Sequence, residues 1–377
     1  MTPAAARSLA VPDRWPRRFA VAGGAAALLS LIGLWAARDQ FFISYLFAYA
    51  FWFLLAAGAF GILLIHHVTG GAWGDIIRPQ LNAAVLTLPL LGLLFLPILG
   101  GLHVLYPWSR AAAAADPLMR HKHIYLNVPF FFLRALFFFA LWSFMAKNLN
   151  RWSASSNPAD AEMARRRSAP GLMVYALTMS FAVLDWLMSI EPRWYSTMFE
   201  GAVIIGGMLT AFAFMAFTLH RLLAQRDGEI IKPYWDLGNL TLAFVMLWAY
   251  LSFSQYLIIF SGNIPEEITW YLHRQQGGWF WGAMALVAFQ FVLPFLILLG
   301  RRNKQKLERL ARVALLILAI GVFHVFWVVE PTFFPGHLHV HWLDAALFAG
   351  IGGIWLAAFF GQLRKQPAFG TAGEAPR

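Results

Sequence analysis

Residues 41–65 read FFISYLFAYAFWFLLAAGAFGILLI, a continuous apolar stretch that contains no charged residue. A helix of about 20 such residues, rising 1.5 Å per residue, crosses the roughly 30 Å hydrocarbon core of a bilayer. The stretch lacks the alternation of polar and apolar residues that is typical of the short strands of a membrane barrel. It therefore predicts a membrane-spanning helix.

Further runs of similar length and composition lie on both sides of this stretch, each between polar breaks. We therefore predict an all-α integral membrane protein with about ten transmembrane helices. Residues 19–363 form a single membrane domain, between polar tails at 1–18 and 364–377. The predicted spans are 19–37, 41–65, 81–105, 128–146, 171–189, 199–222, 237–260, 278–299, 313–329 and 342–363.

The composition excludes a soluble enzyme. Of the 377 residues, 60% are hydrophobic and only 12% are charged, whereas about a quarter of the residues in a soluble domain are charged. The chain has no cysteine, which excludes disulfides, thiolate metal sites, iron–sulfur clusters held by this chain and covalently attached haem. Any redox centre is therefore bound non-covalently or belongs to a partner.

Lysine and arginine are distributed unevenly between alternate loops. With the N-terminus in the cytoplasm, the inside segments hold 22 of them and the outside loops hold six. Cytoplasmic loops carry the excess of positive charge, so we predict that both termini are cytoplasmic. This topology accounts for the net charge of +11 without nucleic-acid binding. The longest inside segment, 151–170, contains SASSNP and three consecutive arginines and predicts a flexible loop.

Two ionisable residues lie well inside predicted spans. Arg134 is about 10 Å from the outer end of its span, and Asp185 is about 8 Å from the outer end of the next one. A charge inside the bilayer is costly unless it is paired or hydrated. Because the two spans are consecutive and antiparallel, we expect the charges to lie at one depth. A structural ion pair and a proton-exchanging Asp185 tuned by Arg134 both fit this expectation.

Other polar side chains gather toward the same outer surface, and two of them share a helix face at i,i+3. A proton-coupled quinol site needs hydrogen-bond partners for the ring oxygens and a carboxylate or imidazole that takes the proton. Besides Arg134 and Asp185, the candidates for a proton pathway or a quinol site in this outer belt are Ser252, Gln255, His324, His103, Glu330 and Asp344.

Three histidines alternate along one outer loop, at His337, His339 and His341. On an extended segment they share one face, which is an arrangement that can bind a metal. A loop that docks onto another protein, or that is simply solvated, also explains them. The sequence leaves the role of this loop open, and we assign no metal ligand.

Five stretches carry a resemblance to a known family. They are HVTGGAW at 67–73, YLNVPFFFLR at 125–134, LDWLMSIEPRWYSTMF at 184–199, LAFVMLWAYLSFSQY at 242–256 and SGNIPEE at 261–267. Each resembles the F-type integral membrane subunit of alternative complex III, a bacterial quinol:cytochrome c oxidoreductase. The paralogous C-type subunit shares the last part of the third stretch, but the residues before it favour the F type. The following residues, EGAVIIGG at 200–207, depart from the aromatic-containing stretch of the family.

The resemblance implies a relative of the NrfD and polysulfide-reductase membrane subunits, with helices arranged largely as two four-helix bundles. It implies that multihaem cytochrome c subunits and an iron–sulfur subunit lie on the periplasmic side. A paralogous C-type membrane subunit is then the one expected to oxidise the quinol. The present chain is expected in the bacterial cytoplasmic membrane, as a proton-handling partner without a covalently bound cofactor.

Three functions remain open from the sequence. The first is a membrane subunit that supports quinol oxidation and proton handling while its partners carry the redox centres. The second is a subunit with its own quinol or quinone pocket near the outer face. The third is a secondary transporter that acts alone, against which the lack of paired Gly- or Pro-broken spans at the membrane midplane argues.

Overall fold

The computed structural model describes residues 11–155, 157–223 and 232–366. The described residues contain helices and no strand, and ten of the helical segments are long and apolar enough to cross a membrane. The predicted all-α fold with ten spans is confirmed, and the chain is a multi-pass membrane protein. The boundaries at 278–299 and 342–363 agree with the predicted ones to the residue.

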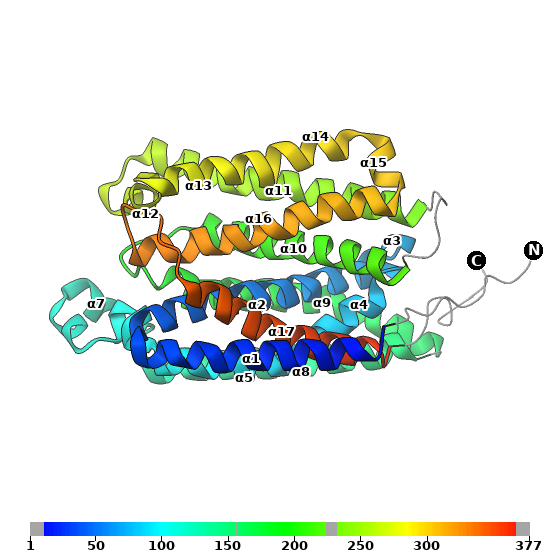
Figure 1. Ribbon diagram of the computed structural model, residues 1–377, viewed down its shortest axis with the longest axis horizontal. Coiled ribbons are helices and arrows are strands. Elements are labelled where there is room, and N and C mark those ends of the chain that lie inside the picture. The colour runs from blue at the N-terminus through cyan, green and yellow to red at the C-terminus, as the bar shows by residue number, and fades with distance from the viewer. Residues whose placement is uncertain (1–10, 156, 224–231, 367–377) are drawn as a thin grey trace, which may run out of the picture.

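The long helices follow one another in antiparallel fashion (Figure 1). Their bounds are α1 (Arg14–Ala36), α2 (Arg38–Thr69), α4 (Arg78–Val85) with α5 (Leu88–Gly100), α8 (Val128–Ala154), α9 (Pro158–Val183) with the π-helical turn η3 (Leu184–Met188), α10 (Thr197–Leu223), α11 (Lys232–Gly262), α13 (Gly278–Leu286) with the π-helical turn η4 (Val287–Val292) and α14 (Leu293–Leu299), α16 (Leu307–Phe333) and α17 (Trp342–Leu363).

Short helices occupy the connections between the long ones. They are α3 (Ala72–Asp75), α6 (Leu102–Leu105), η1 (Pro107–Ser109), η2 (Ala111–Ala115), α7 (Pro117–Lys122), α12 (Pro265–Gln275) and α15 (Arg301–Gln305).

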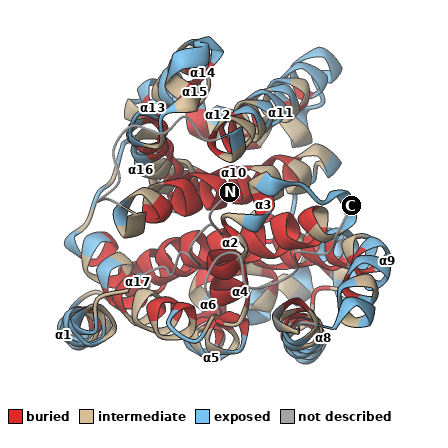
Figure 2. Ribbon diagram, turned by 90° about the vertical axis from the view of Figure 1, so that its right-hand side faces the viewer, coloured by how far each residue is buried: buried red, intermediate tan, exposed pale blue. Residues whose placement is uncertain are grey.

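The helices pack as two four-helix bundles and one additional pair. In the first bundle α2 contacts α4, α5 and α9, while α8 packs against α5 and α9. In the second, α10 contacts α11 and α16, and α14 packs against both of these. Because α2 contacts α10 and α16, it joins the bundles. Figure 2 shows α2 and α10 as the most buried helices, whereas α1, α8 and α11 lie at the periphery.

The additional pair, α1 and α17, packs along the side of the first bundle. A Cβ atom on Gly23 would lie 2.6 Å from the backbone nitrogen of Ile354, and one on Gly353 would lie 2.5 Å from the Cα of Gly23. Glycine at both positions is what allows the two backbones to approach so closely. At the end of the pair, Arg364 forms an ion pair with Asp13 at 2.6 Å. The start of α1 and the end of α17 therefore lie on the same face of the molecule.

The segment 151–170 is not a flexible loop, and this prediction is wrong. α9 begins inside the segment, where the side chain of Asn157 caps its first turn. Glu162 then forms ion pairs with Arg165 and Arg166 along the exposed face of the helix. These local bonds stabilise helical turns beyond the apolar run, so hydropathy alone places the start of the span too late.

The third span is divided into α4 and α5 within the predicted run 81–105. Pro89 cannot donate a backbone hydrogen bond at the start of α5. The hydroxyl of Thr87 donates to the carbonyl of Ala84 at 2.6 Å and accepts a hydrogen bond from Trp355 Nε1 at 2.8 Å. The break in this span is therefore held by a side chain of α17.

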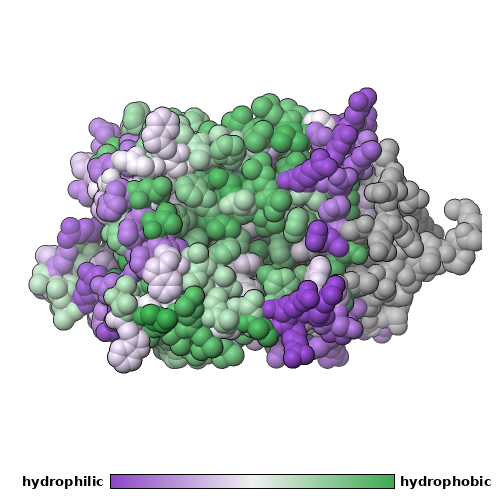
Figure 3. Space-filling view, in the orientation of Figure 1, coloured by the Kyte–Doolittle hydropathy of each residue, from purple (hydrophilic) through white to green (hydrophobic). Residues whose placement is uncertain are grey.

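The surface has the pattern of a protein embedded in lipid. Figure 3 shows hydrophobic residues in a broad band around the middle, with hydrophilic residues at both ends. Large apolar side chains of the spanning helices, such as Leu136, Phe253 and Leu296, are more than half exposed. Exposure of this kind is expected where a helix faces lipid tails instead of water.

Candidate functional site

Arg134 and Asp185 form a bidentate ion pair between α8 and η3. Nε and Nη2 of Arg134 donate to Oδ2 and Oδ1 of Asp185 at 2.7 and 2.9 Å. Nη1 donates to the carbonyl of Tyr125 at 2.9 Å, and the guanidinium lies over the rings of Tyr125 and Phe130. The Asp185 side chain is fully buried. The expected pairing of the two charges is confirmed, while proton exchange at Asp185 stays a prediction.

A π-helical turn presents Asp185 to its partner. The backbone N–H of Ser189 bonds to the carbonyl of Leu184, which is the i→i+5 pattern. The Ser189 hydroxyl bonds to the carbonyl of Asp185 at 2.5 Å and accepts a hydrogen bond from Trp108 Nε1. Such turns are rare and are often found at functional positions. Hydropathy carries no signal for this turn, so the sequence predicts an ordinary helix here.

Ser252, Gln255 and His324 belong to the second bundle, whereas the Arg134–Asp185 pair belongs to the first. The ring of His324 packs edge-on against Trp248, with centroids 5.2 Å apart. Gln255 Nε2, Trp248 Nε1 and Gln290 Oε1 are buried and have no hydrogen-bond partner among the described residues. Buried polar atoms of this kind usually bond to internal water.

Glu330, near the end of α16, and Asp344, in the first turn of α17, lie close enough for their charges to interact, and we call them the acid pair. The Glu330 side chain is 0% exposed, and neither carboxyl oxygen has a hydrogen-bond partner within the described part of the chain. Asp344, in contrast, accepts from Ser44 Oγ, from Gln40 Nε2 at 3.4 Å and from the backbone of His341 at 2.7 Å. Asp344 therefore accepts hydrogen bonds from three protein groups, whereas Glu330 accepts none from the described residues.

A cavity of about 1110 Å³ opens beside the acid pair. His339 Nε2 donates to Gln40 Oε1 at 3.1 Å, and the Gln40 amide nitrogen in turn reaches Asp344. Burial lowers the pKa of His339, although the charge of Asp344 opposes this effect. The cavity is lined by Ala37, Arg38, Asp39, Gln40, Ile43, Gly100, His103, Val104, Arg110, Phe333, Phe334, His339 and His341.

The structure therefore divides the predicted outer belt into three groups. The Arg134–Asp185 pair lies in the first bundle, and the residues around His324 lie in the second. His103, which also bonds to Ser109 at 3.2 Å, lines the large cavity near the acid pair. The belt is not one continuous site.

The three loop histidines do not converge on one point. The ring centroid of His339 lies 6.0 Å from that of His337 and 6.2 Å from that of His341, and the His339 ring stacks on Phe334 at 4.0 Å. Within the described ranges, no group of three or more His, Asp or Glu side chains is arranged to hold a metal ion. The contacts of His339 link this loop to the acid pair through Gln40.

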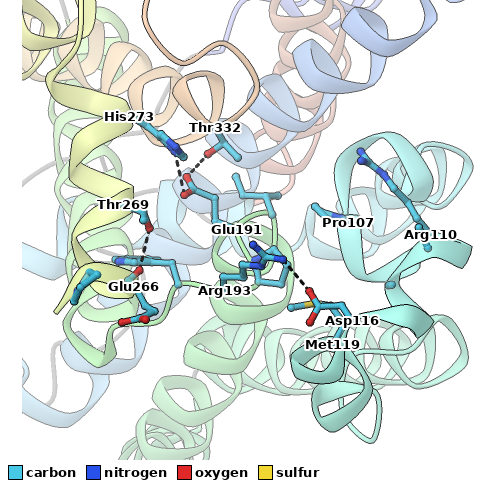
Figure 4. Close-up of a pocket in the computed structure, with 16 residues that line it drawn as sticks. Pro107, Arg110, Asp116, Met119, Glu191, Arg193, Glu266, Thr269, His273 and Thr332 are labelled. Atoms are coloured by element: carbon cyan, nitrogen blue, oxygen red, sulfur yellow. Dashed lines mark hydrogen bonds and ion pairs between the residues drawn. The ribbon is translucent and has the colours of Figure 1, made fainter.

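A second outer cavity, of about 720 Å³, lies between the connection that holds η1, η2 and α7 and the helix α12 (Figure 4). Glu191 lies in its wall and bonds to Thr332 at 2.6 Å and to Arg274 at 3.1 Å, with His273 3.4 Å away. Burial would raise the pKa of Glu191, but Arg274, His273 and Thr332 lower it to about 2. Glu191 is therefore a carboxylate at neutral pH. At the mouth, Arg193 pairs with Asp116.

The sequence did not point to several residues of these sites. Gln40 and Ser44 lie next to Asp344 only because α2 and α17 pack together, although 300 residues separate Ser44 from Asp344. From the sequence, Glu191 and Arg274 were only charged residues in predicted loops, with nothing to indicate that they pair. The one available signal was the position of Glu191 inside the stretch 184–199, which resembles the family.

No protein-family model matches the chain, and a comparison with curated proteins finds no match. The function is therefore argued from the geometry of the acid pair, from the fold and from the five sequence stretches.

Proposed function

We propose that this chain is the F-type membrane subunit of an alternative complex III and handles protons at the periplasmic face of the bacterial cytoplasmic membrane. The ten-helix fold and the five stretches that resemble this subunit support the proposal. In this assembly a paralogous C-type subunit lies in the same membrane. The haems and iron–sulfur clusters belong to multihaem cytochrome c subunits and to an iron–sulfur subunit.

One observation carries the proton-handling role: the carboxyl group of Glu330 lies near Asp344 and has no hydrogen-bond partner among the described residues. A carboxylate buried without donors is strongly disfavoured, and a neighbouring carboxylate disfavours it further. Among the described residues, no hydrogen-bond donor therefore stabilises a negative charge on Glu330. A buried acid that must gain or lose a proton when its surroundings change is suited to proton transfer.

The neighbours of the acid pair provide a route to the outer cavity. Gln40 accepts a hydrogen bond from His339 Nε2, so this nitrogen carries the hydrogen and Nδ1 is the basic atom. Burial lowers the pKa of His339, so Nδ1 of the neutral ring is available as a hydrogen-bond acceptor for water in the cavity. Gln40 orients both His339 and Asp344 without being ionised. Protons released at the pair can thus pass through cavity water to His339 and the outer surface.

The test compares E330Q with E266Q in the complete complex reconstituted in liposomes. Glu266 is an exposed carboxylate at the same end of the molecule and serves as a matched control. We expect E330Q to lower proton release coupled to quinol oxidation by roughly 10²-fold, as is usual for loss of a positioned acid or base. E266Q should behave as wild type. Unchanged proton release in an assembled E330Q complex would remove the proton-handling role.

Membership of the complex has a separate test. The tagged chain, purified from native membranes in mild detergent, should bring down multihaem cytochromes, an iron–sulfur subunit and a paralogous membrane subunit, identified by mass spectrometry. Recovery of the chain alone would contradict membership and favour the transporter function.

A second candidate function is a quinol pocket in the same cavity. Its volume of about 1110 Å³ can hold a ring headgroup, and its lining combines the aromatic rings of Phe333 and Phe334 with the polar groups of Gln40 and His339. These two side chains offer hydrogen-bond partners for the ring oxygens. A photoreactive quinone analogue should then label residues of this cavity, and labelling confined to the C-type subunit would exclude the pocket.

A further inference from the structure

Between Arg301 and Arg312 the chain carries six cationic side chains and a single acidic one, Glu308. Glu308 is occupied, because it forms an ion pair with Arg312. The other cations of α15 and the start of α16 have no ion pair within the ranges that the structure describes. They are Arg301, Arg302, Lys304, Lys306 and Arg309.

The cationic cluster lies at the boundary between the apolar band and one hydrophilic end of the molecule. Figure 1 places α15 at the end of α14, and Figure 3 shows hydrophilic side chains there beside the hydrophobic band. The Arg301 guanidinium lies 4.6 Å from the ring centroid of Trp235, at the start of α11. Tryptophan favours the headgroup level of a bilayer, so this contact indicates the depth of the cluster.

An apolar stripe leads directly to these cations. Leu293, Leu296 and Leu299 follow one another at i,i+3 along α14, and their exposed fractions are 36%, 58% and 53%. The stripe ends two residues before Arg301. An acyl chain that lies along it places its phosphate beside Arg301 and Arg302.

Lys304 adds a further positive charge at the same place. Its stem packs against α11, where a Cβ atom on Gly238 would lie 2.9 Å from the Lys304 Cβ. Burial, together with the charge of Arg301, lowers the pKa of Lys304. Concentrated positive charge that has no acidic partner among the described residues is relieved by a bound anion.

We propose that the exposed surface formed by α14, α15 and the start of α11 binds one anionic phospholipid. Arg301 and Arg302 hold its phosphate, Trp235 lies at the level of the glycerol backbone, and the leucine stripe of α14 supports one acyl chain. The site discriminates by charge, so a zwitterionic lipid binds weakly. It lies on the second bundle, at the opposite end of α16 from the acid pair, and is independent of proton handling.

The test uses the full-length chain, purified in detergent, delipidated and titrated with phosphatidylglycerol, with phosphatidylcholine and with inorganic phosphate in native mass spectrometry. The variant is R301Q/R302Q. The matched control is R17Q/R18Q, which removes the same charge from exposed positions on α1, on the other side of the molecule (Figure 2). Each cation near a membrane surface changes lipid affinity about fivefold, so we expect about a 30-fold loss for R301Q/R302Q and no specific loss for the control.

The single variant R302Q keeps the test informative if the double variant does not fold. Arg302 is exposed and makes no hydrogen bond or ion pair with the described part of the chain, so its replacement leaves the Arg301–Trp235 contact intact. We expect about a fivefold loss of phosphatidylglycerol affinity for this variant. Equal affinity for phosphatidylcholine, or equal losses in variant and control, would overturn the proposal. Complete displacement by millimolar phosphate would also overturn it, because the site would then take the ion alone.

Discussion

Arg274 donates a hydrogen bond from Nε to the carbonyl oxygen of Trp327 at 3.2 Å. This carbonyl is the acceptor that Pro331, four residues later, leaves without an intrahelical donor. The same guanidinium donates to the carbonyl of Val328 at 2.6 Å and to Glu191 at 3.1 Å. A residue of the outer connection thus satisfies a broken stretch of transmembrane backbone, and it fastens α12 to α16.

Replacing Arg274 should therefore destabilise the outer end of the second bundle. R274Q removes the arginine partner of the largely buried Glu191 carboxylate and the donors to two carbonyls, at a cost of about 3–5 kcal/mol. R274K keeps the charge but lacks the planar fork, so it should restore only part of this stability. The measurement is the fraction of monodisperse protein left after heating in detergent. R193Q, which breaks an exposed ion pair at the cavity mouth, is the control and should have little effect.

The same pair makes stability depend on pH in a defined window. Because the folded-state pKa of Glu191 is lowered from 4.5 to about 2, its stabilisation is complete above about pH 4.5 and is lost as the pH falls toward 2. This shift corresponds to stabilisation on the order of 3 kcal/mol. E191Q should therefore melt below wild type at pH 7, and the difference should shrink between pH 4.5 and 2. A difference that is constant with pH would contradict this assignment.

The buried Arg134–Asp185 pair should show strong coupling. D185N removes the carboxylate that pairs with the buried Arg134 guanidinium. Breaking a buried ion pair in this way costs about 3–5 kcal/mol. The double variant R134M/D185L removes both charges and should recover much of the loss. A double-mutant cycle on thermal stability in detergent measures the coupling. If D185N instead keeps full stability and loses coupled proton release, Asp185 exchanges a proton and is not merely structural.

Neighbouring glycines of α1 offer a matched test of helix packing. A Cβ on Gly23 would lie 2.6 Å from backbone atoms of α17, whereas one on Gly24 would meet nothing within 4 Å. G23A should therefore push α1 away from α17 and cost about 1–3 kcal/mol. G24A should be neutral or slightly stabilising, because alanine favours the helix. Protease accessibility of α1 in liposomes distinguishes the two, and equal behaviour of both variants would contradict the close packing.

Hydropathy determined the number of spans because backbone groups in a bilayer must bond within their own helix, which makes each span a local property of the chain. The start of α9 departs from that prediction, since Asn157 and Glu162 stabilise helical turns outside the lipid. The division between α4 and α5 depends on Trp355, a residue of another helix. Neither feature is encoded in a hydropathy profile.

The ion pair of Arg134 and Asp185 was predictable because adjacent antiparallel spans bring residues of equal depth together. The acid pair was predictable only as two separate residues, Glu330 and Asp344. Their difference in hydrogen bonding depends on Gln40, which donates to Asp344 although 304 residues separate the two in the sequence.

The sequence by itself determined that the chain crosses a membrane about ten times and carries its polar groups mainly near one surface. Only the tertiary structure decided which of these groups meet, because helix packing brings together residues that are hundreds of positions apart. Helix packing gave Asp344 its hydrogen-bond donors and left Glu330 without any among the described residues. That asymmetry is a property of packing, and the proposed function rests on it.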